Sequence, residues 1–166
     1  MDIRPIEPDE YARLGALTLE AYTTLDGHVH EPEYEDELYD VRTRAEANDT
    51  VVLVAVDDDV NVLGGVTYAM STASPFHEGQ GENSGSIRML AVDGSHRGAG
   101  IGEALVRECI ARARRDGRDQ IVLHSTMWMH SAHRLYARLG FERDESLDWD
   151  AQPDVPLIGF RLDLNR

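Results

Sequence analysis

Residues 86–102 read SIRMLAVDGSHRGAGIG and join an apolar run, Ile87–Val92, to a helical pattern over Ile101–Arg115. The run predicts a strand, and apolar residues at helical spacing predict an amphipathic helix. The glycines between them let the backbone turn tightly and approach a ligand without a Cβ clash. A helix start offers unpaired N–H groups and a positive dipole end, so the stretch predicts a phosphate or pyrophosphate site. A tight turn alone would use the same glycines.

Two common phosphate-binding motifs do not fit this loop. The chain has no lysine, which the P-loop needs, and the third glycine of a dinucleotide fingerprint would fall at Glu103. The pattern that fits is R-x-x-G-x-G, formed by Arg97, Gly100 and Gly102. The absence of lysine also excludes Schiff-base chemistry, which requires that side chain.

The periodicity of the sequence predicts strands and helices on both sides of the loop. Before it, we expect a strand at 2–6, a helix that opens at Pro8, a helix near 34–48, a hairpin of strands at 51–56 and 60–70, and a loop over 71–85. After it, we expect a helix at 101–115, a strand at 120–124, a helix at 131–139 that ends at Gly140, and strands at 141–143 and 158–164. No repeat or linker divides the chain, so the pattern predicts one α/β domain over residues 1–166.

Composition narrows the class of protein. The chain carries 31 acidic and 16 basic residues, a formal net charge of -15, so a nucleic-acid partner is not expected. The one cysteine, Cys109, excludes an internal disulfide framework, and its place in the apolar stripe of a helix predicts burial. The N-terminus lacks an apolar signal segment, and no apolar run is long enough for a membrane span. We therefore expect a cytoplasmic protein with no membrane partner.

The charge is unevenly distributed. Residues 1–60 contain 17 acids and 4 arginines, whereas residues 86–118 contain four acids and seven arginines. This local excess of arginine surrounds the glycine loop. It suits an anionic ligand, and it equally suits a solvated helix face with scattered arginines.

Residues 86–102 resemble the acetyl-CoA-binding motif of the GNAT family of N-acetyltransferases. Residues 132–141, AHRLYARLGF, are similar to a second family motif, A-x-x-L-Y-x-x-x-G-F. The spacing between the two motifs and the element order from residue 2 to 164 also match the family. The resemblance implies a single-domain α/β fold with a mixed, mostly antiparallel sheet of about six to seven strands, flanked by about four helices.

The resemblance also implies the activity and its residues. The expected reaction is acetyl-CoA-dependent transfer of an acetyl group directly to a primary amine of a small molecule or peptide, with acetyl-CoA as cosubstrate and no metal. Tyr136 matches the family's general acid, which protonates the departing thiolate; outside the motif it would count as a core aromatic residue. The backbone of one strand segment would pair with pantetheine, and the glycine loop would hold the pyrophosphate. These cofactor-binding residues are Leu90, Ala91, Val92, Arg97, Gly98, Ala99, Gly100, Ile101 and Gly102.

Two features depart from the family pattern. Met129 stands where many members have an asparagine, and the strand before the loop carries Ser86 and Arg88 in place of a glutamate base. The base therefore stays open among bulk water and three side chains, Glu37, His77 and Glu82. These departures keep an alternative: a CoA-binding module of the same fold without competent transfer, acting as a sensor or partner protein.

The sequence does not identify the amine that accepts the acetyl group. The acidic stretch Glu31, Glu33, Glu35, Asp36 and Glu37 and the segment Asp148-Trp149-Asp150 fall where the family builds its acceptor site. They suit a cationic amine or, alternatively, a solvated acidic face. The pairs His28-x-His30 and His130-x-x-His133 have metal-ligand spacing, but structural or surface histidines are the expected interpretation. Family members are often homodimers, and the sequence does not decide this.

Overall fold

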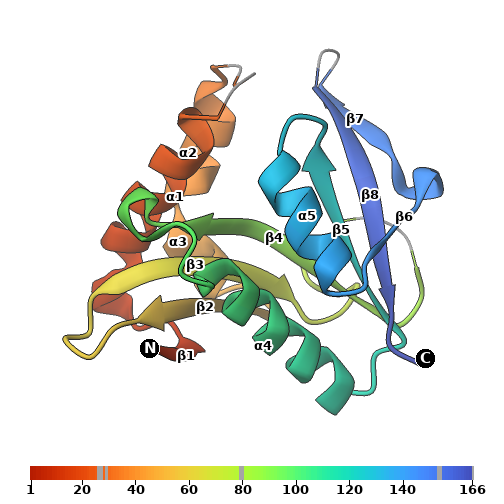
Figure 1. The fold of residues 1–166 in the computed structure, drawn as a ribbon, viewed down its shortest axis with the longest axis horizontal. Helices are drawn as coiled ribbons and strands as arrows, with labels where there is room; N and C mark the ends of the chain where they lie inside the picture. The colour runs from red at the N-terminus through yellow and green to blue at the C-terminus, as the bar shows by residue number, and fades with distance from the viewer. Residues whose placement is uncertain (26–27, 29, 79–80, 153–154, 166) are drawn as a thin grey trace.

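A computed structural model of the protein describes residues 1–25, 28, 30–78, 81–152 and 155–165. They form an eight-stranded sheet in the order β1-β2-β3-β4-β5-β8-β6, with β7 paired to β8 (Figure 1). The β4–β5 pair is parallel, and the other described pairs are antiparallel. The strands are β1 (Asp2–Pro5), β2 (Thr50–Val56), β3 (Val62–Ala69), β4 (Ser84–Val92), β5 (Gln120–Thr126), β6 (Glu142–Arg143), β7 (Trp149–Gln152) and β8 (Val155–Asp163).

Five α-helices and three 3-10 turns connect these strands in the described part of the chain. The helices are α1 (Tyr11–Thr23), α2 (Pro32–Tyr39), α3 (Val41–Ala45), α4 (Ile101–Arg115) and α5 (His130–Arg138). The 3-10 turns are η1 (Pro8–Glu10), η2 (Gly94–His96) and η3 (Glu145–Leu147). None of the described helices is long and apolar enough to cross a membrane.

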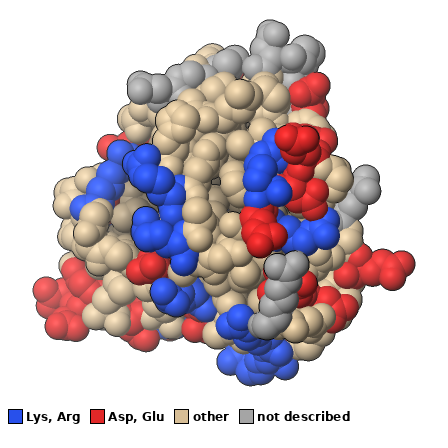
Figure 2. All heavy atoms as spheres, turned by 45° about the vertical axis from the view of Figure 1, so that its right-hand side comes forward, with Lys and Arg blue, Asp and Glu red and all other residues tan. Residues whose placement is uncertain are grey.

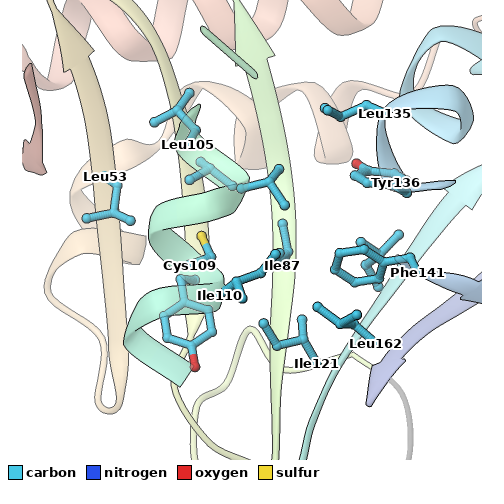
Figure 3. Packing of buried hydrophobic residues seen from close by; sticks show 14 of the residues in the cluster. Leu53, Ile87, Leu105, Cys109, Ile110, Ile121, Leu135, Tyr136, Phe141 and Leu162 are labelled. Atoms are coloured by element: carbon cyan, nitrogen blue, oxygen red, sulfur yellow. The ribbon is translucent and has the colours of Figure 1, made fainter. Parts of the chain in front are cut away.

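The sheet carries a separate apolar cluster on each face. Strand β2 supplies both, because its side chains alternate: Leu53 and Ala55 join the cluster under α4 and α5, and Val54 joins the cluster under α1 and α3. Figure 3 shows the first cluster, with Leu105 and Cys109 of α4 directed toward the central strands. Cys109 is fully buried, as predicted, and burial raises the pKa of its thiol. The two clusters hold helices on opposite faces of one sheet.

The mixed, mostly antiparallel α/β fold is confirmed; the described residues form eight strands and five α-helices, where six to seven strands and about four helices were expected. The predicted helix over 34–48 is two helices, because Asp40 leaves helical geometry (φ -80°, ψ 77°) and its carboxylate accepts a hydrogen bond from the Thr43 N–H. The missed strand, β7, lies in an acidic segment of low strand propensity and exists because it forms a hairpin with β8.

Candidate active site

The glycine loop has the geometry of an anion site. Gly98 and Gly100 both adopt φ +81°, a left-handed conformation that favours glycine, and Gly100 caps the 15-residue helix α4. A Cβ atom at either position would meet no heavy atom within 4 Å, so the space over the loop is open. Ala99 is exposed between them, whereas Ile101 is buried and anchors the helix start. Open space over a helix N-terminus fits a pyrophosphate.

The arginine excess around this loop is partly neutralised by its own acids. Along α4, Arg107 pairs with Glu103 at 3.5 Å and Arg112 pairs with Glu108 at 3.0 Å. Figure 2 shows basic side chains in a band down the left of the drawn face, and a mixed group of acidic and basic side chains on the right. Part of the arginine-rich segment is therefore a paired helix face, as the second interpretation expects.

Strands β4 and β5 separate beside the loop. Their parallel pairing runs from Ser84–Gln120 to Ile87–Leu123 and ends there. On its other edge, β4 continues to pair with β3 as far as Val92, across a bulge at which Met89 adopts φ +55°. The segment 90–92 is thus bordered by β3 on one edge and has no described strand partner toward β5. Main-chain groups along such an edge suit an amide-bearing arm such as pantetheine.

A cavity of about 410 Å³ lies where the two strands separate. Its walls come from α1 and α2 on one side and from β5, α5, β7 and β8 on the other; these groups flank β4 in Figure 1. The lining is largely aromatic, apolar and acidic. It includes Tyr22, Tyr34, Trp128, Trp149, Leu25, Leu38, Met89, Leu90, Leu157, Glu31, Glu33, Glu37, Glu78, Arg88, His124 and Tyr136.

Tyr136 connects the apolar core to this cavity. The residue is 6% exposed, and its ring centre lies 5.7 Å from that of Phe141 and 6.0 Å from that of Phe160. Figure 3 shows its hydroxyl end pointing from α5 toward β4. Burial raises the pKa of the phenol, so the hydroxyl stays protonated at neutral pH. The structure therefore places the phenol hydroxyl at the cavity wall. Tyr136 is both a core aromatic residue and part of the cavity lining.

A series of charged side chains lies on the wall of the cavity opposite Tyr136. Arg88 on β4 forms an ion pair with Glu78, lies 3.5 Å from a Glu37 carboxylate oxygen, and stacks 5.8 Å from the centre of the Phe76 ring. Glu78 in turn lies 3.6 Å from Nδ1 of His124. The backbone of Glu78 exchanges hydrogen bonds with the Ser86 hydroxyl, which ties this loop residue to β4.

Only one of the three predicted base candidates lines the described cavity. Glu37 does so, whereas Glu82 is exposed on the loop before β4. His77 is not part of the cavity lining, and its Nε2 lies 2.9 Å from the Ser84 hydroxyl oxygen. The pKa of His77 is lowered because the ring is partly buried. Glu78 and His124 were not singled out from the sequence. The two residues come together only when β5 lies beside the loop that precedes β4. Met129 lines the cavity where an asparagine was expected.

The predicted acidic acceptor segments separate in the structure. Glu31, Glu33 and Glu37 line the cavity, whereas the Glu35 carboxylate lies 2.6 Å from Nδ1 of His30. Asp148 turns away to accept hydrogen bonds of 2.7 and 2.5 Å from Arg143, and Trp149 lines the cavity in its place.

The histidine pairs have different surroundings. His28 and His30 gather with Glu35 so that one ligand atom from each lies within 4.8 Å of the others. His133 instead binds backbone: its Nε2 lies 2.9 Å from the Thr126 carbonyl oxygen. The absence of a metal stays a prediction.

Known proteins resemble this chain in sequence and in fold. Human N-alpha-acetyltransferase 30 is 43% identical over 63 residues, which are 38% of this chain and 17% of that protein. Human N-acetyltransferase 8B is 44% identical over 54 residues, 32% of this chain and 24% of that protein. The matched segments thus span at most about a quarter of these two curated relatives.

Solved structures share the whole fold at low identity. An acetyltransferase of the GNAT family from Staphylococcus aureus Mu50 superposes with a TM-score of 0.77 at 16% identity, covering 98% of each chain. The structure of yncA from Salmonella typhimurium, solved with acetyl-CoA, superposes with a TM-score of 0.67 at 19% identity, covering 100% of this chain and 95% of that one. The model of the acetyltransferase (GNAT) family matches residues 14–141, which include both sequence motifs. With the glycine loop, the separated strands and Tyr136 in one arrangement, this chain belongs to the GNAT family of acetyltransferases.

Proposed function

We propose that this protein transfers an acetyl group from acetyl-CoA directly to a primary amine of a small molecule or peptide. The observation that carries the proposal is the meeting of three features at one place: the open glycine loop, the gap between β4 and β5, and a cavity that contains the Tyr136 side chain. An acetyl thioester held along β4 would present its reacting end to this cavity.

The cosubstrate-binding roles follow from this arrangement. The backbone of Leu90, Ala91 and Val92 would pair with pantetheine, and Arg97 would add positive charge beside the pyrophosphate. The N–H groups of the loop and first helical turn would bind the pyrophosphate oxygens; these are the groups of Gly98, Ala99, Gly100, Ile101 and Gly102. Acetyl-CoA supplies the activated acetyl group, and these residues bind and orient it.

Tyr136 is proposed as the general acid. The departing sulfur needs a proton, and a buried phenol with a raised pKa is in the protonated form that can donate one. Its ring is fixed between Phe141 and Phe160, so the hydroxyl is held in one direction. Neighbouring main-chain N–H groups at Leu90 or Ala91 would stabilise the charge that develops on the carbonyl oxygen.

The cavity supports a cationic acceptor that also carries apolar or aromatic groups. Glu31, Glu33 and Glu37 give its rim a negative charge, which attracts an ammonium group. Aromatic faces at Tyr34 and Trp149 suit both apolar contact and cation–π attraction. Peptides with a free N-terminus and small aromatic or polyamine cations all meet this description.

A thiol-release assay with tyramine, spermidine and an alanine-initiated peptide tests the proposal. We expect amine-dependent release of free CoA by the wild-type protein. The Tyr136→Phe variant should bind acetyl-CoA with unchanged affinity and lose about 10²- to 10⁴-fold in turnover. Thiol release by this variant at the wild-type rate would refute the acid assignment. Acetyl-CoA binding without thiol release from any amine would support the binding-module alternative.

A further inference from the structure

We propose that Glu78 and His124 together are the base of this site: Glu78 contacts the acceptor ammonium, and His124 takes up its proton. The inference rests on the proposed function, since it concerns the acceptor amine of that reaction. Neither residue belongs to a family motif in this sequence, and the strand position where a glutamate was expected holds Arg88.

The hydrogen bonding of His124 defines its protonation pattern. Its Nε2 lies 2.7 Å from the carbonyl oxygen of Leu147. A carbonyl oxygen can only accept, so Nε2 carries the hydrogen, and in the neutral ring Nδ1 carries the lone pair. The His124 side chain is 1% exposed, and Nδ1 has no hydrogen-bond partner among the described residues. Buried polar atoms seldom lack a hydrogen-bond partner. We therefore infer that this nitrogen accepts a proton from a bound ligand.

Glu78 lies between that nitrogen and the cavity. Its two carboxylate oxygens have different neighbours: Oε1 forms an ion pair with Nε of Arg88, and Oε2 lies 3.6 Å from Nδ1 of His124. Its side chain is 18% exposed and lines the cavity, whereas the His124 nitrogen is enclosed. An ammonium group in the cavity would therefore reach the carboxylate first, with the imidazole directly behind it.

The sheet places this pair opposite Tyr136. Side chains alternate along a strand, so His124 and Ser125 project from opposite faces of β5. Ser125 meets His133 of α5, the helix that also carries Tyr136. His124 therefore projects from the other face, where the Arg88–Glu78 pair lies. Proton acceptor and proton donor thus flank the gap between β4 and β5 from opposite faces, as a reaction that removes protons from nitrogen and delivers one to sulfur requires.

The proton balance of the step is closed by these residues and water. The ammonium gives one proton through Glu78 to Nδ1 of His124, and the free amine then forms the C–N bond as the C–S bond breaks. The nitrogen loses its second proton to water, and Tyr136 gives its proton to the sulfur and regains one from water. The products are the amide and the free thiol, and His124 returns the one net proton to solvent.

Several charged or titratable groups surround the pair. They are Arg88 on β4, Glu37 on α2, Asp148 before β7, and His77 on the loop that carries Glu78. The Glu78 carboxylate faces Nδ1 of His124 at 3.6 Å. Removing that carboxylate would take away the group through which a proton passes from the ammonium to the imidazole.

The test compares pH–rate profiles of thiol release between pH 5.5 and 9.5, with tyramine or, if tyramine is not accepted, spermidine. The His124→Gln variant keeps a side-chain N–H that can reach the Leu147 carbonyl, but it has no titrating nitrogen. We expect its turnover at pH 7 to fall about 10²-fold or more, with acetyl-CoA affinity unchanged. Its rate should then rise tenfold per pH unit as more of the amine loses its proton in solution. Glu78→Gln should also lower turnover, because it removes the carboxylate that meets the ammonium first.

The His133→Gln variant is the matched control, because His133 also places Nε2 against a backbone carbonyl but projects from α5 outside the described cavity lining. It should keep the wild-type profile. Wild-type activity with a His124→Gln profile within threefold of wild type at every pH would overturn the base while leaving the proposed function intact. Absence of wild-type thiol release with every amine would overturn the function, and the base with it.

A measurement on the wild-type protein covers the case in which a variant fails to fold. The ¹⁵N spectrum of the His124 imidazole should show hydrogen on Nε2 and none on Nδ1 in the neutral ring. The opposite tautomer would overturn the assignment.

Discussion

The left-handed glycine at the start of α4 allows the cofactor loop to be tested separately from fold stability. In Gly100→Ala, the added methyl group meets no protein atom within 4 Å, so steric clash with the protein contributes nothing. The cost comes from φ +81°, which disfavours a residue with a Cβ atom by about 1–2 kcal/mol. For a chain of this size each kcal/mol lowers the melting temperature by about 2–4 °C.

The same methyl group occupies the open space in which the proposed pyrophosphate lies. If the backbone leaves the left-handed region to relieve strain, the loop N–H groups turn away instead. Either response removes at least one charge-assisted hydrogen bond, worth about 1.5–3 kcal/mol. Acetyl-CoA affinity should therefore fall about 10- to 150-fold. Isothermal titration calorimetry measures the affinity, and urea unfolding measures the stability.

Gly117→Ala is the strain-matched control. Gly117 has φ +74° and equally open space, but it follows the C-terminal end of α4, away from the loop. Gly94→Ala adds a methyl group in open space in the turn before the loop, without a left-handed φ. We expect Gly117→Ala to lose stability but not affinity, and Gly94→Ala to lose neither. An unchanged acetyl-CoA affinity in Gly100→Ala, or an equal loss in Gly117→Ala, would refute the pyrophosphate role.

Two further predictions concern charge. Glu37→Gln removes a carboxylate from the cavity lining and should raise the KM for a cationic amine severalfold, an effect of about 1 kcal/mol that salt weakens. Asp36→Asn lies outside the described cavity lining and should leave this KM unchanged. Equal KM shifts in both variants would contradict the acceptor model. Glu10 accepts two 2.9 Å hydrogen bonds from Arg4, which hold the pKa of its carboxyl below the usual range. The stability it contributes is therefore present above its unfolded pKa of about 4.3 and is lost as pH falls through the lowered folded value. Urea unfolding between pH 3 and 6 should show this slope, and Glu10→Gln should reduce it.

The parts of the fold predicted correctly are those with local causes. The strand before the loop, the glycine turn and the helix from Ile101 to Arg115 are encoded by consecutive residues, and the structure reproduces the helix bounds. The helix predicted over 34–48 was wrong because its break depends on one side-chain hydrogen bond at Asp40. Strand β7 was missed because its partner, β8, and not its own composition, makes it a strand.

The candidate site also combines features that a short stretch of sequence predicts with contacts that only the tertiary structure makes. Residues 86–102 and 132–141 indicated the family by resemblance, which the family model confirms. The glycine turn and the helix that carries Tyr136 were predictable because each depends on the glycines and the helical periodicity of one short stretch. Only the tertiary structure brought Glu78 beside His124, since one lies on the loop before β4 and the other on β5. It also turned Asp148 away from the cavity and placed Trp149 in its wall. Those contacts depend on where β4 and β5 stop pairing, and that depends on the packing of helices on both faces of the sheet, which no single stretch of sequence contains.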